Sequence, residues 1–365
     1  MKACDDCLRR ARLVADLAPR IAALVGRPGA RAPGLLALPD VRLIEAAAGE
    51  RGDQARERLE RFEPDAERAL LQDHGVLATC RHAQEYPPGL LDMTDPPAAL
   101  FAVGEPGVLA EMHDRPSVAI VGTRAPSPYG AEVAHALGRG LGASGVIVVS
   151  GLALGIDATA HRGCLNGGGT PVAVLAGGPE RAYPRRHRLL HEAVAREGLV
   201  LSELPPRATA YRWSFPARNR IMAGLARLTV VVEAADPSGS LITADFARDL
   251  GRTVAAVPGR VTSRMAHGTN GLLRDGAVPV TGTEDVLDEL YGAGIRPRSV
   301  TEPRRSAPDP RLKALLDAVE AGCAVDEMAG RVGRTTADVR AALGRLEAEG
   351  HVVRGTLGGW ERTAG

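Results

Sequence analysis

Short runs of continuous apolar residues recur through the middle of the chain, bounded by glycines or polar turns and separated by segments with helical periodicity. The runs are Val118–Val121, Val146–Val149, Val172–Leu175, Leu199–Leu201, Leu228–Val232, Val254–Val257 and Val278–Val280. Strands that are apolar on both faces and alternate with helices are typical of a parallel sheet covered on both sides. The pattern therefore predicts an α/β fold with a Rossmann-like, doubly wound, mostly parallel sheet.

The two ends of the chain have different patterns. Residues 1–75 place apolar side chains such as Leu13, Leu17 and Ile21 at helical spacing, which predicts a small helical N-terminal domain. A stretch rich in proline, arginine and glycine at 292–310 predicts a linker. Three short helices and a candidate hairpin follow within 311–365, the pattern of a winged helix-turn-helix domain. We therefore expect the Rossmann-like domain to span residues 76–291.

Charge and composition limit the classes of partner. The 365 residues carry a formal net charge of +1, so any nucleic-acid site has to be a local patch. No apolar stretch is long enough to span a bilayer, and acids stand near the N-terminus where a signal peptide has an apolar core. The five cysteines lack the spacing of a disulfide framework. We expect a cytoplasmic protein that has no membrane partner.

A glycine-rich turn follows one of the predicted strands. After Val146–Val149 the chain reads Ser150-Gly151-Leu152-Ala153-Leu154-Gly155 and then becomes helical. The first turn of a helix has free backbone N–H groups, and glycines let a ligand approach the backbone closely. The arrangement predicts an anion site, and we expect the anion to be a phosphate.

Arginines, hydroxyls and aromatic residues follow the carboxyl ends of the predicted strands, where ligands bind in an open parallel sheet. Arginine binds phosphate as a planar fork, and aromatic rings beside it offer stacking surfaces for unpaired bases. The chain is only 3% aromatic, yet Tyr183, Tyr211, Trp213 and Phe215 fall in two of these loops. The predicted DNA contacts are Arg124, Gly151, Arg185, Arg186, Phe215, Arg218, Asn219, Arg220, Ser238 and Ser240.

Several catalytic and nucleotide-binding motifs are missing from the sequence. Gly122 is not followed by the G-x-G-x-x-G fingerprint of dinucleotide binding, and neither a P-loop nor a G-x-S-x-G elbow is found. We therefore predict no catalytic residues and no cofactor.

An ordered series of motifs over residues 86–290 closely resembles the DNA-processing protein A family (DprA, also called Smf). The motifs are Tyr86-Pro87, Val121-Gly122-Thr123-Arg124, Tyr129-Gly130, Ser150-Gly151-Leu152-Ala153, Gly155-Ile156-Asp157, Ala160-His161, Tyr183-Pro184, Ser202-Glu203, Phe215 to Ile221, Val232-Glu233-Ala234, Ser238 to Thr243, Pro258-Gly259, Gly268-Thr269-Asn270 and Gly276-Ala277. Each motif alone is weak evidence, but their combination in unbroken order is specific.

The resemblance implies a single-stranded-DNA-binding recombination mediator of natural transformation (competence) that has no known catalytic reaction. Such a protein protects incoming single-stranded DNA, forms a homodimer, and helps load a RecA-type recombinase past single-strand-binding protein. The family's contact arginines fall on Arg124, Arg185 and an Arg-Asn-Arg turn at 218–220. Thr123, Leu154 and His187 depart from the residues usual in the family.

An enzyme is the alternative function. The phosphoribohydrolase-like nucleotide-processing enzymes have a similar Rossmann-type core and a P-G-G-x-G-T-x-x-E motif with a catalytic glutamate. The corresponding stretch here runs from Pro237 to Ala244 and contains no glutamate, which disfavours this alternative.

Two questions stay open at the ends of the chain. Cys4, Cys7, Cys80 and His82 are either four zinc ligands or two unrelated pairs of residues. The C-terminal domain either reads duplex DNA through its third helix or docks a protein.

Overall fold

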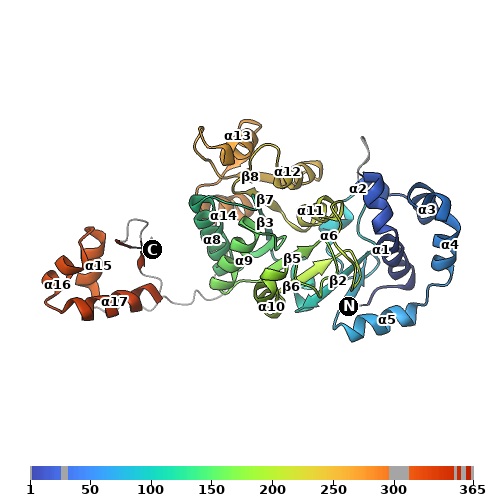
Figure 1. The fold of residues 1–365 in the computed structure, drawn as a ribbon. Coiled ribbons are helices and arrows are strands. Elements are labelled where there is room, and N and C mark those ends of the chain that lie inside the picture. The colour runs from blue at the N-terminus through green and yellow to red at the C-terminus, as the bar shows by residue number, and fades with distance from the viewer. Residues whose placement is uncertain (1, 26–31, 296–311, 349–351, 355–358, 363–365) are drawn as a thin grey trace. The chain divides into compact units, whose positions relative to one another are not determined.

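The computed structural model describes residues 2–25, 32–295, 312–348, 352–354 and 359–362. Contacts between residues divide the chain into two compact units, Met1–Val300 and Thr301–Gly365. The first unit contains a large sheet together with the N-terminal helices (Figure 1).

A nine-stranded sheet forms the centre of the first unit, with the strand order β1-β2-β6-β5-β4-β3-β7-β8-β9. The strands are β1 (Leu77–Cys80), β2 (Ala99–Gly104), β3 (Ser117–Val121), β4 (Ile147–Ser150), β5 (Pro171–Leu175), β6 (Leu199–Ser202), β7 (Leu228–Val231), β8 (Thr253–Ala256) and β9 (Val278–Pro279). The seven strands from β3 to β9 pair in parallel, as predicted. Strands β1 and β2 were not predicted, and they extend one edge by antiparallel pairing.

Helices cover both faces of this sheet. One face packs against α8 (Pro128–Ala143), α9 (Ile156–Asn166), α10 (Arg188–Glu197) and α14 (Thr283–Tyr291). The other packs against α6 (Pro88–Leu91), α7 (Gly107–Glu111), α11 (Ser214–Leu225), α12 (Gly239–Asp249) and α13 (His267–Arg274). Short 3-10 turns lie at Gly49–Arg51, Arg185–His187 and Arg264–Ala266. The observed three-layer architecture confirms the predicted Rossmann-like fold class.

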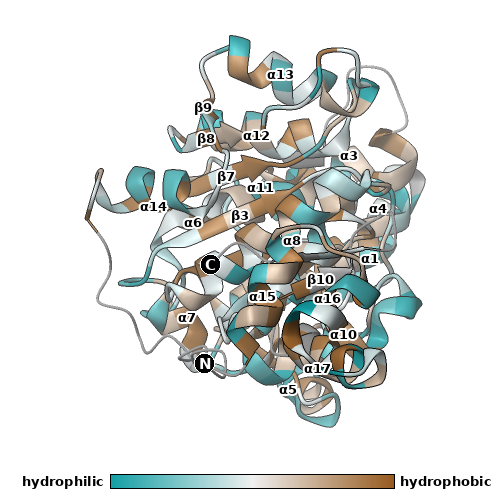
Figure 2. Cartoon of the chain, turned by 90° about the vertical axis from the view of Figure 1, so that its left-hand side faces the viewer, coloured by the Kyte–Doolittle hydropathy of each residue, from teal (hydrophilic) through white to brown (hydrophobic). Residues whose placement is uncertain are grey.

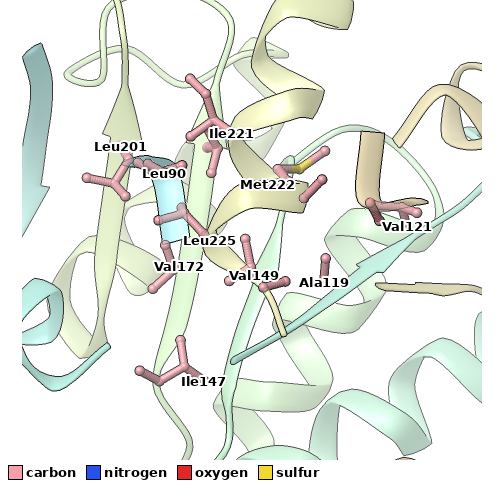
Figure 3. Packing of buried hydrophobic residues seen from close by; sticks show 14 of the residues in the cluster. Leu90, Ala119, Val121, Ile147, Val149, Val172, Leu201, Ile221, Met222 and Leu225 are labelled. Carbon is pink, nitrogen blue, oxygen red and sulfur yellow. The ribbon is translucent and has the colours of Figure 1, made fainter. Parts of the chain in front are cut away.

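The continuous apolar runs follow from burial on both faces, because successive side chains of a strand point to opposite sides. In β3, Val118 and Ile120 pack toward α8 and α9, while Ala119 and Val121 pack toward α11. Figure 3 shows the side of the sheet that α11 covers, with Ile221 and Met222 of α11 lying over the strands. Strands β3 and β7 are accordingly brown, the hydrophobic colour, in Figure 2.

The N-terminal helices pack onto the sheet domain through a shared core. They are α1 (Asp5–Val25), α2 (Ala32–Leu36), α3 (Asp40–Ala48), α4 (Gly52–Glu60) and α5 (Pro64–Asp73). Leu17 and Ile21 of α1 belong to a cluster that includes Trp213. The Trp213 indole Nε1 donates a hydrogen bond of 2.9 Å to the carbonyl of Ala18. Trp213 is therefore buried between the helices and the sheet domain, which corrects its prediction as a stacking surface.

The second unit has its own apolar core, built around Leu316, Met328 and Leu343. It contains α15 (Lys313–Glu320), α16 (Val325–Val332), α17 (Thr336–Ala348) and the antiparallel pair β10 (Val352–Arg354) and β11 (Trp360–Arg362). The elements follow the predicted order, with three helices before the hairpin. The assignment of this unit as a winged helix-turn-helix domain stays a prediction. Within the described residues, no helix is both long and apolar enough to cross a membrane.

Candidate nucleic-acid interface

A cavity of about 600 Å³ lies at the carboxyl ends of the strands, between β3 and the elements that follow β7. The chain passes from β3 to β4 on one side of β3 and later returns to place β7 on its other side. Such a reversal of strand order is where open α/β sheets bind ligands. The polar and aromatic residues that line this rim cavity are Thr123, Arg124, Asp157, Tyr183, Arg212, Phe215, Arg218, Asn219, Ser238, Ser240 and Thr243.

Arg124 and Tyr183 come from two loops and Phe215 from the first turn of α11, and the three side chains meet at the cavity. The Arg124 guanidinium carbon lies 5.4 Å from the centroid of the Phe215 ring, within the range of a cation–π contact. The Tyr183 and Phe215 ring centroids are 5.5 Å apart, and the rings are tilted by 50°. Arg124 and Tyr183 are exposed and Phe215 is half-buried, so the cluster presents both ring surface and positive charge to solvent.

Arg218 lies beneath this cluster, 6% exposed, and it also lines the cavity. Its guanidinium donates a hydrogen bond to the carbonyl of Val174, while its Nε has no hydrogen-bond partner in the described structure. Burial lowers the pKa of Arg218 to about 10, and the carboxylate of Asp157 opposes that shift. The side chain is therefore still cationic at neutral pH where it lines the cavity.

Gly151 is in contact with this arginine, because a Cβ atom at position 151 would overlap the Arg218 guanidinium. We expect Gly151→Ala to displace the guanidinium and to weaken binding of an anionic ligand by about 1.5–3 kcal/mol, the range for a hydrogen bond to a charged group. Fluorescence anisotropy with a labelled single-stranded oligonucleotide measures this loss. Gly107→Ala is the matched control for the added methyl group, since a Cβ there meets no atom within 4 Å and the position does not line the rim cavity. Equal affinities of the two variants would contradict the prediction.

The glycine-rich turn before α9 does not present the free amides that were predicted. The Gly151 N–H donates to Asp157 Oδ2 at 3.1 Å, and the Ile156 N–H donates to the Thr123 carbonyl at 3.2 Å. Burial raises the pKa of Asp157, and the nearby Arg218 opposes that effect. These two amides therefore donate to a carboxylate and a carbonyl of the chain itself and are not free to bind a phosphate. The prediction of a phosphate site at this turn is corrected accordingly.

The N-terminus of α12 faces the cavity instead. Ser238 is its N-cap, and the Ser238 and Ser240 hydroxyls lie 2.8 Å apart. Asn219 of α11 donates from Nδ2 to the Gly239 carbonyl at 3.1 Å, which ties the two helices together. The N-terminus of a helix carries a partial positive charge, so this turn is suited to a phosphate.

Arg185 and Arg186 lie outside the cavity on the loop between β5 and α10, and both are exposed. The neighbouring His187 is buried, and its Nδ1 lies 3.0 Å from the carbonyl of Leu152. This contact joins the arginine loop to the turn before α9, so the two arginines extend the positive rim beyond Tyr183.

These residues fall within a stretch that matches a known family. The model of the family described as DNA recombination-mediator protein A matches residues 78–291. The chain belongs to this family.

Two relatives of the recombination-mediator family show how far the likeness extends. The DNA processing protein DprA of Bacillus subtilis is 37% identical over 247 residues, which are 67% of this chain and 81% of the relative. The X-ray structure of DNA processing protein A from Streptococcus pneumoniae has a TM-score of 0.62 and 30% identity, covering 79% of this chain and 99% of that one.

A structure of the Helicobacter pylori protein bears on the ligand. It is described as giving insight into the single-stranded-DNA binding mode of DNA processing protein A from that organism. It matches with a TM-score of 0.52 and 29% identity, covering 59% of this chain and 95% of that one. The family is thus described as one of DNA recombination mediators, and the Helicobacter pylori relative is described by its binding of single-stranded DNA.

Within this recombination-mediator fold, Arg220 is placed differently from the other predicted contacts. Its side chain is buried, with Nε 2.8 Å from Asp95 Oδ2 and an Nη 2.7 Å from Glu203 Oε1. Burial opposes its charge, but Glu203 and Asp95 outweigh that effect and raise the pKa of Arg220. The Arg220 guanidinium is therefore paired inside the protein and does not line the rim cavity. Arg212, absent from the predicted contacts, does line the cavity, and its place between Tyr211 and Trp213 was the available signal.

Glu233 also has a structural position in this fold. Its carboxylate accepts hydrogen bonds from the Ser127 N–H at 2.9 Å and from the Ser127 hydroxyl at 2.5 Å, at the start of α8. Among the described residues that line the rim cavity, Asp157 is the one carboxylate, and the Gly151 amide already binds it.

Proposed function

We propose that this chain binds single-stranded DNA along the rim cavity and acts as a recombination mediator. The observation that carries the proposal is the contact cluster of Arg124, Phe215 and Tyr183. Aromatic rings at an open surface stack on splayed bases, and such stacking is independent of base identity. Duplex DNA hides these base faces, so the cluster favours a single strand.

The surroundings of this cluster offer contacts for the DNA backbone. Arg185 and Arg186 are exposed beside Tyr183, and the Arg218 side chain lines the cavity. Ser238 and Ser240 add hydroxyls at the N-terminus of α12. Arginine forks and helix N-termini are the usual ligands of phosphates. Because the net charge of the whole chain is only +1, its affinity for DNA depends on this local patch of arginines. Binding should therefore weaken steeply as the salt concentration rises.

The cellular role that we propose follows from the family. The protein protects incoming single-stranded DNA in the cytoplasm during natural transformation, acts as a homodimer, and helps to load a RecA-type recombinase past single-strand-binding protein. Support comes from the match to recombination mediators and from the likeness to the Helicobacter pylori structure, which is described by its single-stranded-DNA binding mode. A strand-exchange reaction started on oligonucleotides coated with single-strand-binding protein tests the loading step. No gain in recombinase filaments over the reaction without this protein would contradict it.

We propose no catalytic activity for the cavity. A phosphoribohydrolase needs a carboxylate that can reach the sugar, whereas the Asp157 carboxylate is buried and hydrogen-bonded to Gly151. Incubation with nucleoside monophosphates and chromatography of the products tests this point. Release of free base above the rate of the uncatalysed reaction would favour the enzyme alternative.

The direct test of DNA binding compares a labelled single-stranded oligonucleotide with its duplex by fluorescence anisotropy at two salt concentrations. We expect preference for the single strand and weaker binding at the higher salt. Equal affinity for both forms, or no binding by well-folded protein, would overturn the proposed function.

We expect Phe215→Ala to reduce single-stranded-DNA affinity by about 1–3 kcal/mol, roughly 5- to 140-fold, because the variant removes the central ring of the cluster. Phe215→Tyr keeps a ring of similar size and is expected to bind nearly as the wild type does. Anisotropy titrations give both affinities, and thermal melting checks that the half-buried position tolerates each change. An alanine variant that binds as well as the tyrosine variant would remove Phe215 from the interface.

A further inference from the structure

Four side chains of types that can bind a metal meet beside β1, the edge strand of the sheet, away from the rim cavity. One ligand atom from each of Cys4, Cys7, Cys80 and His82 lies within 4.8 Å of all the others. The His82 Nδ1 is 3.4 Å from the Cys4 sulfur and 3.5 Å from the Cys7 sulfur. Residues that are more than 70 positions apart in the sequence are thus brought to one point.

The local structure explains how both pairs of residues face this point. Cys4 directly precedes α1 and Cys7 lies in its first turn, so the two sulfurs fall on the same end of the helix. Cys80 ends β1, and the Ala83 N–H donates to the Cys80 carbonyl at 2.8 Å, which closes a turn that carries His82. The Cys4 N–H lies 3.5 Å from the Cys80 sulfur. Backbone N–H groups directed at sulfur, and the start of a helix, stabilise thiolates.

The distances can be compared with the geometry of a tetrahedral zinc ion. Zinc binds thiolate sulfur at about 2.3 Å and imidazole nitrogen at about 2.0–2.1 Å. In a regular tetrahedron these bond lengths place a sulfur and a nitrogen roughly 3.6 Å apart and two sulfurs roughly 3.8 Å apart. The two measured sulfur-to-nitrogen distances, 3.4 and 3.5 Å, agree closely with the first of these values.

We propose that Cys4, Cys7, Cys80 and His82 bind one structural zinc ion. Three thiolates and one imidazole fill the four positions of a closed site, which leaves none for water or substrate and so fits a structural role. Zinc displaces the thiol protons on binding, so no oxidant or reductant is needed. A disulfide would join two of the sulfurs and leave the third sulfur and His82 without a function, and the cysteines in the structure are free.

The zinc ion would fasten the start of α1 to the edge strand β1. Cys7 and Cys80 are buried in one apolar cluster with Leu8 and Phe101, so the metal would complete a core that already joins helix and sheet. Strands β2, β6, β5 and β4 separate β1 from β3, so this site is remote from the rim cavity. Loss of zinc should therefore lower stability while leaving single-stranded-DNA affinity of the folded protein nearly unchanged.

The test is metal analysis of the full-length protein, purified under reducing conditions without chelator. We expect one zinc per chain, and we expect Co²⁺ exchanged into the site to show the thiolate-to-cobalt charge-transfer band of tetrahedral coordination. His82→Ala changes an exposed side chain and is expected to keep the fold but lose most of the zinc, as is Cys4→Ser. Cys323→Ser, in the other compact unit, is the control and should retain the full content.

Three results would overturn the proposal. The first is wild-type protein that has free thiols, takes up no zinc from added zinc salt, and shows no charge-transfer band with Co²⁺. The second is unchanged zinc content in both His82→Ala and Cys4→Ser. The third is a disulfide among the three cysteines in zinc-free protein from reducing cells, detected by mass spectrometry.

Discussion

Arg124→Glu is expected to weaken single-stranded-DNA binding by about 2–3 kcal/mol, which is roughly 30- to 140-fold. The substitution removes a cation that lies 5.4 Å from the Phe215 ring, and it places an anion where we propose that the DNA backbone runs. The dependence of affinity on salt should also fall, by about 0.7 in the logarithmic slope for each phosphate of a single strand that the variant no longer neutralises. Anisotropy titrations over a series of salt concentrations measure both quantities.

The control for this prediction has to change the net charge equally at a remote position. Arg196→Glu does so, because Arg196 is 70% exposed at the C-terminal end of α10, near the amino end of β6 and thus opposite the rim. We expect it to reduce affinity only slightly, through the general field. Arg185→Glu should behave like Arg124→Glu. Unchanged binding in both rim variants would show that the DNA site lies elsewhere.

The sequence predicts the parallel part of the sheet well because burial on both faces imposes a local pattern. Each of the seven apolar runs became a strand between β3 and β9. It does not predict that β2 runs antiparallel beside β6, since that pairing joins residues about one hundred positions apart. The strand β2 is itself an apolar run, Ala-Leu-Phe-Ala-Val, and this signal was available. By contrast, β1 has four residues and no distinctive alternation.

The buried position of Trp213 shows a second limit of sequence analysis. Its place beside Phe215 and several arginines favoured a stacking role, yet its indole N–H binds the Ala18 carbonyl 195 positions away. An aromatic residue in a loop can be a ligand contact or the anchor of another domain, and sequence patterns alone do not separate the two. Only the packing of α1 against this loop decides between them.

The three predicted contacts at 218–220 do not all reach the rim cavity, and the reason is geometric. They were interpreted as a turn, but the structure places them inside α11, Ser214–Leu225. Residues two apart on an α-helix point roughly 200° apart, so Arg218 and Arg220 cannot face the same cavity. Arg218 points to the cavity and Arg220 points to Asp95 and Glu203 on the other side. Helical periodicity applied to this motif would have separated the two arginines.

The position of Arg220 leads to the second large effect. Arg220→Met is expected to lower the free energy of unfolding by about 3–5 kcal/mol, because it leaves two carboxylates near a buried site without their cation. Asp95 is 6% exposed and Glu203 is 17% exposed, so solvent compensates for little of the loss. Urea denaturation followed by circular dichroism measures the change. Arg220→Lys keeps the charge but loses the planar fork that binds both carboxylates, and should give an intermediate loss.

Two further measurements separate this structural role from a role in DNA binding. The triple variant Arg220→Met, Asp95→Asn, Glu203→Gln removes all three charges and should recover much of the lost stability, since the cost comes from unpaired charge. At a temperature where Arg220→Met is still folded, its single-stranded-DNA affinity should match that of the wild type. If the affinity falls as it does in Arg124→Glu while stability hardly changes, Arg220 contacts DNA, and the guanidinium must leave its two carboxylates when the strand binds.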